Sequence, residues 1–161
     1  MSPHSLVAYR TRVPHDWVDY NGHLNIGYYM IAFDKATDGF ADHLGIGLTY
    51  RNATGNSFYI VDAHLCFERE VMEGAPIRVE TLVVAADDKR VHFCHSMVEE
   101  TGGFLAATAE MLLLHVDLAT RRAAPFPAEP ARAITALAQA HATLARPAQL
   151  GRTVMLRRKG G

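Results

Sequence analysis

The chain has 161 residues, of which 49% are hydrophobic, and 16 Lys and Arg stand against 17 Asp and Glu. This length suits one domain, and the fraction of hydrophobic residues is high enough to form a core that needs no disulfide bond or metal ion for stability. The formal net charge of −1 excludes bulk electrostatic binding of nucleic acid, which requires a concentrated basic surface.

The cysteines and the hydropathy pattern bear on the compartment. Cys66 and Cys94 lie in strand-like segments and lack the Cys-x-x-Cys spacing of a metal or redox site. We therefore expect two free, packed thiols in a cytoplasmic protein. The N-terminal segment has no apolar run of signal-peptide length, and no segment approaches the roughly 20 apolar residues of a membrane span.

The first predicted elements are a strand and a long helix. Residues 6–13 predict a strand that ends at Pro14. After a polar turn, apolar residues recur at helical spacing from about Asn25, and Gly45 and Gly47 supply stop signals. The apolar face of this helix is wide, so other elements must wrap around it. Its predicted apolar positions are Ile26, Met30, Phe33, Phe40 and Leu44.

Four strand-like segments follow, at residues 58–69, 77–86, 91–99 and 104–117. Short turns between consecutive strands predict an antiparallel meander. The whole is an α+β layout in which one long helix lies on a curved sheet. Several strands are apolar on both faces, so one face can cover the helix while the other meets a second surface. This pattern favours a homodimer, or a homotetramer.

A second helix is expected over about residues 130–146, because Pro130 suits a first turn. His141 interrupts its thin apolar stripe, which is typical of an outer packing helix. The basic residues 157–159 are expected to form a solvated tail. We predict a domain over residues 1–127, with residues 128–161 as a helix and tail packed on it or extending from it.

The stretch before the long helix is dense in polar side chains, with Asp19, Asn21, His23 and Asn25 in alternation. The first N–H groups of a helix lack internal partners and, with the helix dipole, favour developing negative charge. A carboxylate nearby can act as nucleophile or general base, so this stretch contains the parts of an acyl-transfer site. The alternative is ordinary capping and turn formation, for which one side chain is enough.

Residues 19–36, DYNGHLNIGYYMIAFDKA, resemble the D-x-x-G-H-x-N-x-x-x-Y-x-x-x-F-[DE]-x-A signature of hotdog-fold acyl-CoA thioesterases, the 4-hydroxybenzoyl-CoA thioesterase-like group. The likeness covers roughly residues 7–127. It is closest to the betainyl-CoA thioesterases of carnitine degradation, through W-x-D-Y-N-G-H, DDKR-x-H and E-x-x-L-L-H-V-D. The resemblance implies a hotdog fold, in which a curved antiparallel sheet wraps a central helix. It also implies edge-to-edge dimers with active sites at the interface, and hydrolysis of a small acyl-CoA without a metal or other cofactor.

The resemblance also implies roles for particular residues. The family's catalytic aspartate corresponds to Asp19, and His23 and Asn25 match its H-x-N. Backbone N–H groups of residues 55–58 in the partner would polarise the thioester carbonyl. Some relatives instead use an acidic residue within the helix, where this chain has Asp34 and Asp38.

A betainyl group would carry a quaternary ammonium, which aromatic faces attract. Asp62 on the adjacent strand is a candidate counter-charge, although Asp62 and His64 share one strand face and could instead be a buried pair at the dimer seam. Ordinary packing is the alternative for the aromatic residues. The candidate aromatic residues are Trp17, Tyr20, Tyr28 and Tyr29, and the candidate partners of the CoA phosphates are Arg69, Lys89 and Arg90.

Three rival functions stay open. A hotdog enoyl-CoA hydratase or dehydratase would have a D-x-N-P-x-H motif, whereas this chain has Gly22 in place of the proline. A non-catalytic acyl-CoA-binding module would keep the fold without turnover. A metal site is disfavoured, because the histidines lack a familiar ligand spacing and His92 and His95 fall on opposite faces of a strand.

Overall fold

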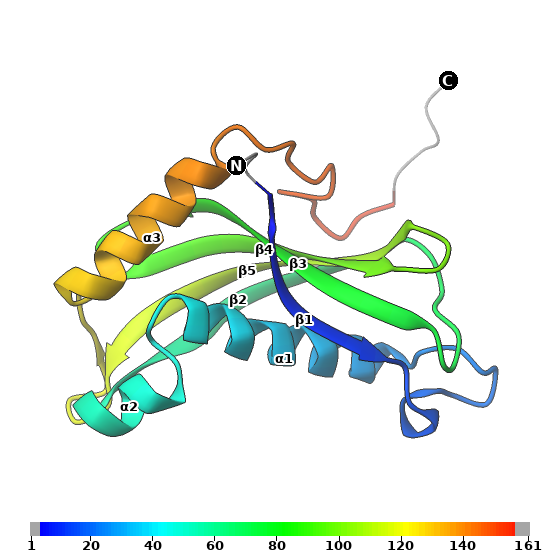
Figure 1. Cartoon of the computed structure of the whole chain (residues 1–161), viewed down its shortest axis with the longest axis horizontal. Coiled ribbons are helices and arrows are strands. Elements are labelled where there is room, and N and C mark those ends of the chain that lie inside the picture. Colours follow the sequence, from blue (N-terminus) through cyan, green and yellow to red (C-terminus); the bar gives the residue numbers. More distant parts are fainter. Residues whose placement is uncertain (1–3, 157–161) are drawn as a thin grey trace.

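The computed structural model describes residues 4–156 and confirms the α+β class, with a curled antiparallel sheet around a long helix (Figure 1). The sheet has the order β1-β3-β4-β5-β2, and the short β6 pairs with β5. The strands are β1 (Leu6–Arg12), β2 (Asn56–Phe67), β3 (Pro76–Ala86), β4 (Arg90–Glu99), β5 (Phe104–Asp117) and β6 (Arg122–Ala123). The helices are α1 (Ile26–His43), α2 (Leu48–Thr54) and α3 (Ala128–His141), with a 3-10 turn η1 (His15–Trp17).

Helix α1 lies in the hollow of the sheet, and its buried face is set by Tyr29, Phe33, Ala36 and Phe40. Phe40 packs on Phe93 of β4 with ring centroids 5.0 Å apart. These residues repeat every three or four positions, so they form one face toward the sheet. Two predicted members of that face are exposed, Ile26 at 68% and Met30 at 37%. Met30 lies beside the buried row, whereas Ile26 continues its spacing but is the first residue of the helix.

The predicted strands are confirmed to within two residues at each end, but the helical segments differ more. Helix α2 was not predicted, since its seven residues carry no clear apolar period. Helix α3 ends at His141, five residues earlier than expected. Nδ1 of His141 accepts a hydrogen bond from the backbone N–H of Val83 at 2.9 Å. The end of α3 is thereby fixed to β3, and burial lowers the pKa of this imidazole.

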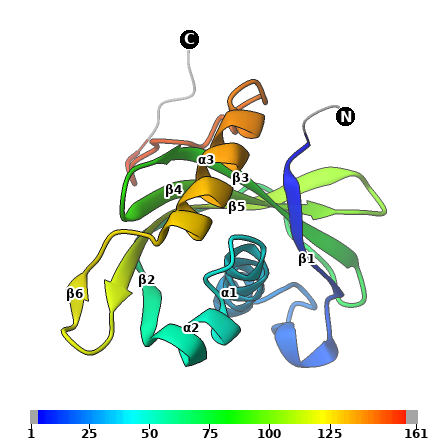
Figure 2. The same ribbon diagram turned by 60° about the vertical axis from the view of Figure 1, so that its left-hand side comes forward.

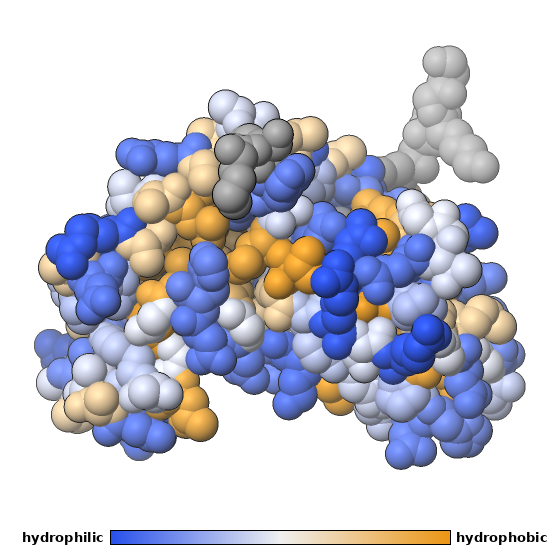
Figure 3. Space-filling view, viewed as in Figure 1, coloured by the Kyte–Doolittle hydropathy of each residue, from blue (hydrophilic) through white to orange (hydrophobic). Residues whose placement is uncertain are grey.

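The outer face of the sheet is covered in part by α3 and by the segment that follows it (Figure 2). Gly151 donates its N–H to Glu110 of β5 at 2.7 Å, and Gln149 donates to Glu68 at 2.7 Å. In the space-filling view, hydrophobic side chains gather in the middle of one face, between α3 and β1 (Figure 3). The apolar outer face is therefore partly covered by its own chain and does not by itself require a second copy.

Three further expectations concern single features. Cys66 and Cys94 are both free thiols, and burial raises the pKa of Cys94 to about 12. Within residues 4–156, no helix combines the length and apolar character needed to cross a membrane. The expected basic tail at residues 157–159 lies outside the described part of the chain.

Candidate active site

The polar stretch before α1 forms a tight loop that is anchored on both sides. Val18 and Leu24 form an isolated bridge, and Gly22 occupies the turn with a φ of 76°. Such a positive φ favours glycine, which has no Cβ to clash. The N–H of Leu24 donates to the carbonyl of Val71 at 2.8 Å. The loop is therefore held against the segment that precedes β3.

Asp19 is half-buried in this loop, and its carboxylate also stabilises it. Oδ1 accepts hydrogen bonds from the N–H of Asn21 at 2.8 Å and of His23 at 3.4 Å. This is the local turn that Asp side chains commonly form. A carboxylate has two oxygens, so Oδ2 can still act on a substrate or a water.

Asn25 is the N-cap of α1, and its Oδ1 accepts a hydrogen bond from the N–H of Gly27 at 3.0 Å. The capping alternative therefore holds for this residue. His23 is half-buried and its backbone bridges Met72. The structure brings Asp19, His23 and Asn25 together in one loop, and a catalytic role for them remains a prediction.

Only two of the four predicted aromatic residues form a common surface. Trp17 and Tyr28 stack, with ring centroids 5.7 Å apart. Tyr29 is 5% exposed and packs edge-on against Phe67 at 5.1 Å, so it is a core residue. Tyr20 is 98% exposed. A cage of all four rings is therefore not formed within the chain.

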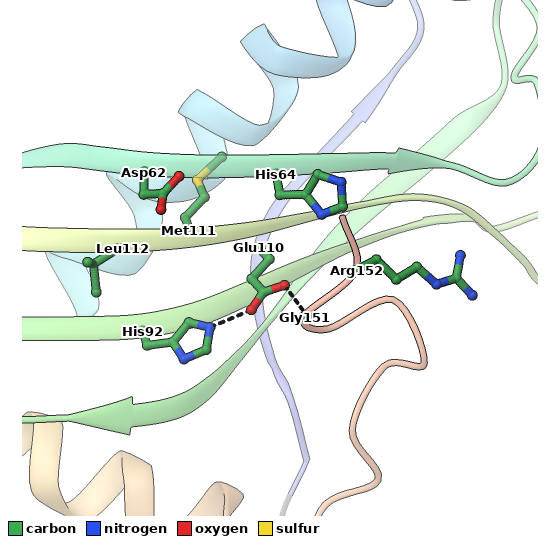
Figure 4. Close-up of a pocket in the computed structure, with 8 residues that line it drawn as sticks. All are labelled: Asp62, His64, His92, Glu110, Met111, Leu112, Gly151 and Arg152. Carbon is green, nitrogen blue, oxygen red and sulfur yellow. Dashed lines mark hydrogen bonds and ion pairs between the residues drawn. The ribbon is translucent and has the colours of Figure 1, made fainter. Parts of the chain in front are cut away.

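Asp62 and His64 share one face of β2, as predicted, but this is the outer face of the sheet (Figure 4). Side chains alternate along a strand, and Phe67 of β2 meets α1 through Tyr29. Asp62 and His64 point the other way, into a cavity of about 370 Å³. Within the chain, Asp62 therefore does not lie beside the aromatic residues of the loop, and its role as a counter-charge remains a prediction. The cavity is completed by His92, Glu110, Met111, Leu112, Gly151 and Arg152.

A second cavity, of about 450 Å³, lies between α1, α2 and the start of β2. Asp38 and Asp42 line it from α1, and Ser57 and Phe58 line it from β2. Burial, followed by the nearby Asp34, raises the pKa of Asp38. Asp42 was not singled out from the sequence, although its spacing of four from Asp38 places both carboxylates on one side of the helix.

Two of the three basic residues considered for CoA phosphates, Arg69 and Arg90, have local partners. Arg90 donates Nε to Asp87 at 2.7 Å, and this hydrogen bond is the main cause that lowers the pKa of Asp87 to about 2. The guanidinium of Arg69 lies 4.0 Å from the centre of the Phe104 ring. Across residues 4–156, no group of three or more His, Cys, Asp or Glu side chains could hold a metal ion.

The comparisons with known proteins agree on one family. The sequence profile described as the Thioesterase-like superfamily matches residues 13–140. The betainyl-CoA thioesterase of Pseudomonas aeruginosa is 40% identical over 94% of this chain and 95% of its own length. The L-carnitine dehydrogenase/betainyl-CoA thioesterase of Ruegeria pomeroyi is also 40% identical, over 88% of this chain and 28% of that longer protein.

Solved structures show the same fold. A candidate thioesterase from Pseudomonas putida KT2440 has a TM-score of 0.83 and 32% identity, over 96% of this chain and 99% of that one. A Staphylococcus aureus protein solved in complex with CoA has a TM-score of 0.89 and 23% identity, over 95% and 97%. With its hotdog fold and its match to the Pseudomonas aeruginosa enzyme over nearly the full length of both chains, the chain belongs to the Thioesterase-like superfamily and is a thioester hydrolase.

Proposed function

We propose that this enzyme hydrolyses a small acyl-CoA, with betainyl-CoA as the first candidate, to the free acid and CoA. The observation that carries the proposal is the 40% identity to the betainyl-CoA thioesterase of Pseudomonas aeruginosa over nearly the whole of both chains. The fused relatives join L-carnitine dehydrogenase to the same thioesterase by name, so carnitine metabolism is the proposed setting. A cytoplasmic location belongs to the same proposal.

Asp19 is the proposed catalytic carboxylate. It either attacks the thioester carbonyl or activates a water molecule that does so. Because Oδ1 already accepts hydrogen bonds within the loop, Oδ2 is the oxygen assigned to this step. His23 and Asn25 orient the water, the carbonyl or Asp19 itself. The leaving thiol, with a pKa of about 8.5, needs little protonation, so we propose that no cofactor takes part.

The rest of the site comes from a second copy in the proposed homodimer, which can associate further into a tetramer. The edge of β2 that faces away from β5 would pair with its counterpart. Backbone donors to the carbonyl oxygen then come from residues 55–58 of the partner. The N–H groups of Gly55 and Asn56 already donate within their own chain, at 2.9 and 3.1 Å. Ser57 pairs with Val116, and the hydrogen bond from Leu118 N–H to the Gly55 carbonyl sets a ladder phase in which Ser57 N–H points to β5 and Phe58 N–H points to the free edge. Phe58 is therefore the proposed donor.

The acyl group is proposed to lie between an aromatic and an acidic wall. The stacked Trp17 and Tyr28 offer ring faces that attract a quaternary ammonium. The cavity beside Ser57 contributes the carboxylates of Asp38 and Asp42 from across the seam. Asp38 also remains the alternative catalytic carboxylate.

The rival functions have less support. The matched family and the curated relatives are thioesterases, which does not favour a hydratase or dehydratase. A binding module without turnover would release no CoA. Free thiol, followed with a thiol reagent, therefore separates the binding module from the enzyme.

The experiment compares betainyl-CoA with 3,3-dimethylbutanoyl-CoA, its neutral isostere, by kcat/KM. Cation–π attraction of about 1–2 kcal/mol predicts a preference of roughly 5- to 30-fold for the cation. Equal rates would remove the proposed cation site while leaving thioester hydrolysis intact. No CoA release from either substrate would exclude this acyl class. Activity that is unchanged after treatment with a chelator is expected, since no metal takes part.

A further inference from the structure

The short helix α2 leads directly into β2 at the edge of the sheet (Figure 2). Between them Gly55 adopts a φ of 73°, which turns the chain sharply from helix to strand. Helix α2 and the first residues of β2 form one wall of the cavity of about 450 Å³ beside α1, and Ser57 and Phe58 belong to this wall. The position of the proposed donor, the N–H of Phe58, therefore depends on how α2 is fixed to the sheet.

A chain of side-chain hydrogen bonds makes that connection. Asn56 Nδ2 donates to the hydroxyl oxygen of Tyr50 at 3.3 Å, and the same hydroxyl lies 2.9 Å from Nε2 of His115. Nδ1 of His115 lies 2.7 Å from the backbone carbonyl oxygen of Ala124. The chain of hydrogen bonds thus runs from the start of β2, through α2, to β5 and the segment after β6.

The chemistry of the end groups fixes the direction of each hydrogen bond in this chain. A carbonyl oxygen only accepts, so Nδ1 of His115 carries a proton and donates to Ala124. In the neutral imidazole Nε2 is then an acceptor, and the Tyr50 hydroxyl donates to it. The amide nitrogen of Asn56 only donates, so it uses a lone pair of the same hydroxyl. The Tyr50 hydroxyl therefore donates and accepts at once.

His115 is a firm anchor for these hydrogen bonds, because it is fully buried. Its backbone N–H donates to the carbonyl of Lys89 at 2.8 Å, and its carbonyl accepts from the N–H of Ala124 at 3.1 Å. His115 also lies directly opposite Phe58 in the ladder between β2 and β5. Because the N–H of Phe58 points to the free edge, this is a non-hydrogen-bonded pair, in which the side chains lie closer together. The anchor and the proposed donor are therefore cross-strand neighbours.

We propose that Tyr50 is a positioning residue for thioester hydrolysis: its hydroxyl, held by His115, fixes Asn56 and with it the N–H of Phe58. The inference rests on the proposed function, in which that N–H polarises the thioester carbonyl. Asn56 and Phe58 are two positions apart, so their side chains share one face of the strand and their N–H groups share one edge. An oxyanion donor is effective when it is held in place before the charge develops. Tyr50 acts through Phe58 and not on the reacting atoms.

The first test removes the hydroxyl and keeps the ring. Tyr50→Phe should lower kcat roughly tenfold and leave KM within about twofold of wild type, because an oxyanion donor acts mainly in the transition state. The substrate is whichever of betainyl-CoA and 3,3-dimethylbutanoyl-CoA the wild type hydrolyses faster. Tyr9→Phe, on β1 at the other edge of the sheet, removes an equivalent hydroxyl and should change neither constant.

A second control separates positioning from stability. Ile134 in α3 is buried, and Ile134→Val removes one methylene from the core. Its Tm should fall by roughly 2–4 °C, as expected also for Tyr50→Phe, while its kcat stays at the wild-type value. Circular dichroism checks that every variant is folded at the assay temperature.

The second test retains or removes the acceptor that Tyr50 uses. The amide of Gln can reach the place of Nε2 in His115, whereas the shorter Asn reaches only the place of Nδ1. His115→Gln should therefore keep at least about three times the kcat of His115→Asn. The double variant Y50F/H115N should lie within about twofold of the slower single variant, because both substitutions remove the same contact.

A third readout needs no substrate. Amide hydrogen exchange of residues 55–60, followed by mass spectrometry, reports how firmly the start of β2 is held. Exchange should be at least about fivefold faster in Tyr50→Phe than in wild type. It should be unchanged in Tyr9→Phe.

The outcomes separate the inference from the proposed function. Wild-type kcat in Tyr50→Phe, or an equal fall of kcat in Ile134→Val, would overturn the inference and leave the thioesterase proposal standing. If the wild type releases no CoA from either substrate, the proposed acyl class fails, and the exchange measurement decides whether Tyr50 anchors the strand. Unchanged exchange in Tyr50→Phe would overturn the inference in either case. Slower turnover at unchanged KM together with faster exchange supports it.

Discussion

Oδ1 of Asp19 accepts a hydrogen bond from the backbone N–H of Asn21 at 2.8 Å. The carboxylate proposed for catalysis therefore also fixes the loop that carries it. Positioned groups react faster because their geometry is set before the substrate binds. The same contact means that structural and chemical roles of Asp19 must be separated by the choice of substitution.

Asp19→Asn separates these roles, because the amide keeps an oxygen that can accept the loop hydrogen bonds. It removes the negative charge and the base, so kcat should fall at least about 100-fold while the fold is retained. Steady-state kinetics and thermal unfolding measure the two effects. Asp16→Asn, in the adjacent exposed turn, is the matched control. Activity near that of wild type would remove Asp19 from the mechanism and direct attention to Asp38.

Asn25 is expected to contribute to both stability and activity. Asn25→Ala removes the N-cap of α1 and should lower the free energy of unfolding by about 1 kcal/mol. Asn25→Ser keeps a capping oxygen, so stability should return while turnover stays reduced. Urea unfolding measures the stability of the two variants, and kcat measures their turnover. If Asn25→Ser also restores turnover, the residue acts only as a cap.

Gly39 is required where α1 crosses β1. A Cβ added there would collide with the backbone carbonyl oxygen of Ala8. Neither backbone can move freely, so Gly39→Ala should destabilise the protein by about 1–3 kcal/mol. A Cβ at Gly27, in the same helix, would meet only Asn25 Oδ1 at 3.5 Å. Gly27→Ala should be neutral or stabilising, and denaturant titration of both variants tests the contrast.

His95 should make stability depend on pH. It is fully buried, with Nδ1 2.8 Å from Thr81 Oγ1 and Nε2 3.0 Å from Thr37 Oγ1. Burial lowers its pKa from 6.5 to about 3. The unfolded chain therefore binds the extra proton first, and stability falls as the pH drops from about 6.5 toward 3. The slope from this group is at most about 1.4 kcal/mol per pH unit.

His95→Gln removes the titrating group and is the comparison for that prediction. Its free energy of unfolding should be lower than that of wild type at pH 7, and the gap should narrow as the pH falls. Urea titrations between pH 7 and pH 4 measure the gap. A residual slope is expected from His141, whose pKa burial also lowers. A constant gap across this range would contradict the assignment.

The sequence was a good guide to the elements that have a clear period. The strand alternation and the spacing of Phe33 and Phe40 in the long helix indicate which faces are buried, and the structure confirms those elements. Helix α2 was not predicted, because its seven residues are too few to show a helical period of apolar side chains. At the early end of α3, His141 accepts a hydrogen bond from Val83 of β3, a long-range contact that no local pattern encodes.

The candidate site likewise has features that the sequence predicts and features that required the tertiary structure. The order of residues by itself determined that Asp19, His23 and Asn25 share one loop, because they are near neighbours before a helix. Only the tertiary structure decided that Tyr29 belongs to the core, and that Asp62 and His64 face away from α1 into a cavity with Glu110. The physical reason is that burial and the face of a sheet depend on which strands pair and how the sheet curls. Those relations join residues far apart in the chain, and local sequence periodicity does not record them.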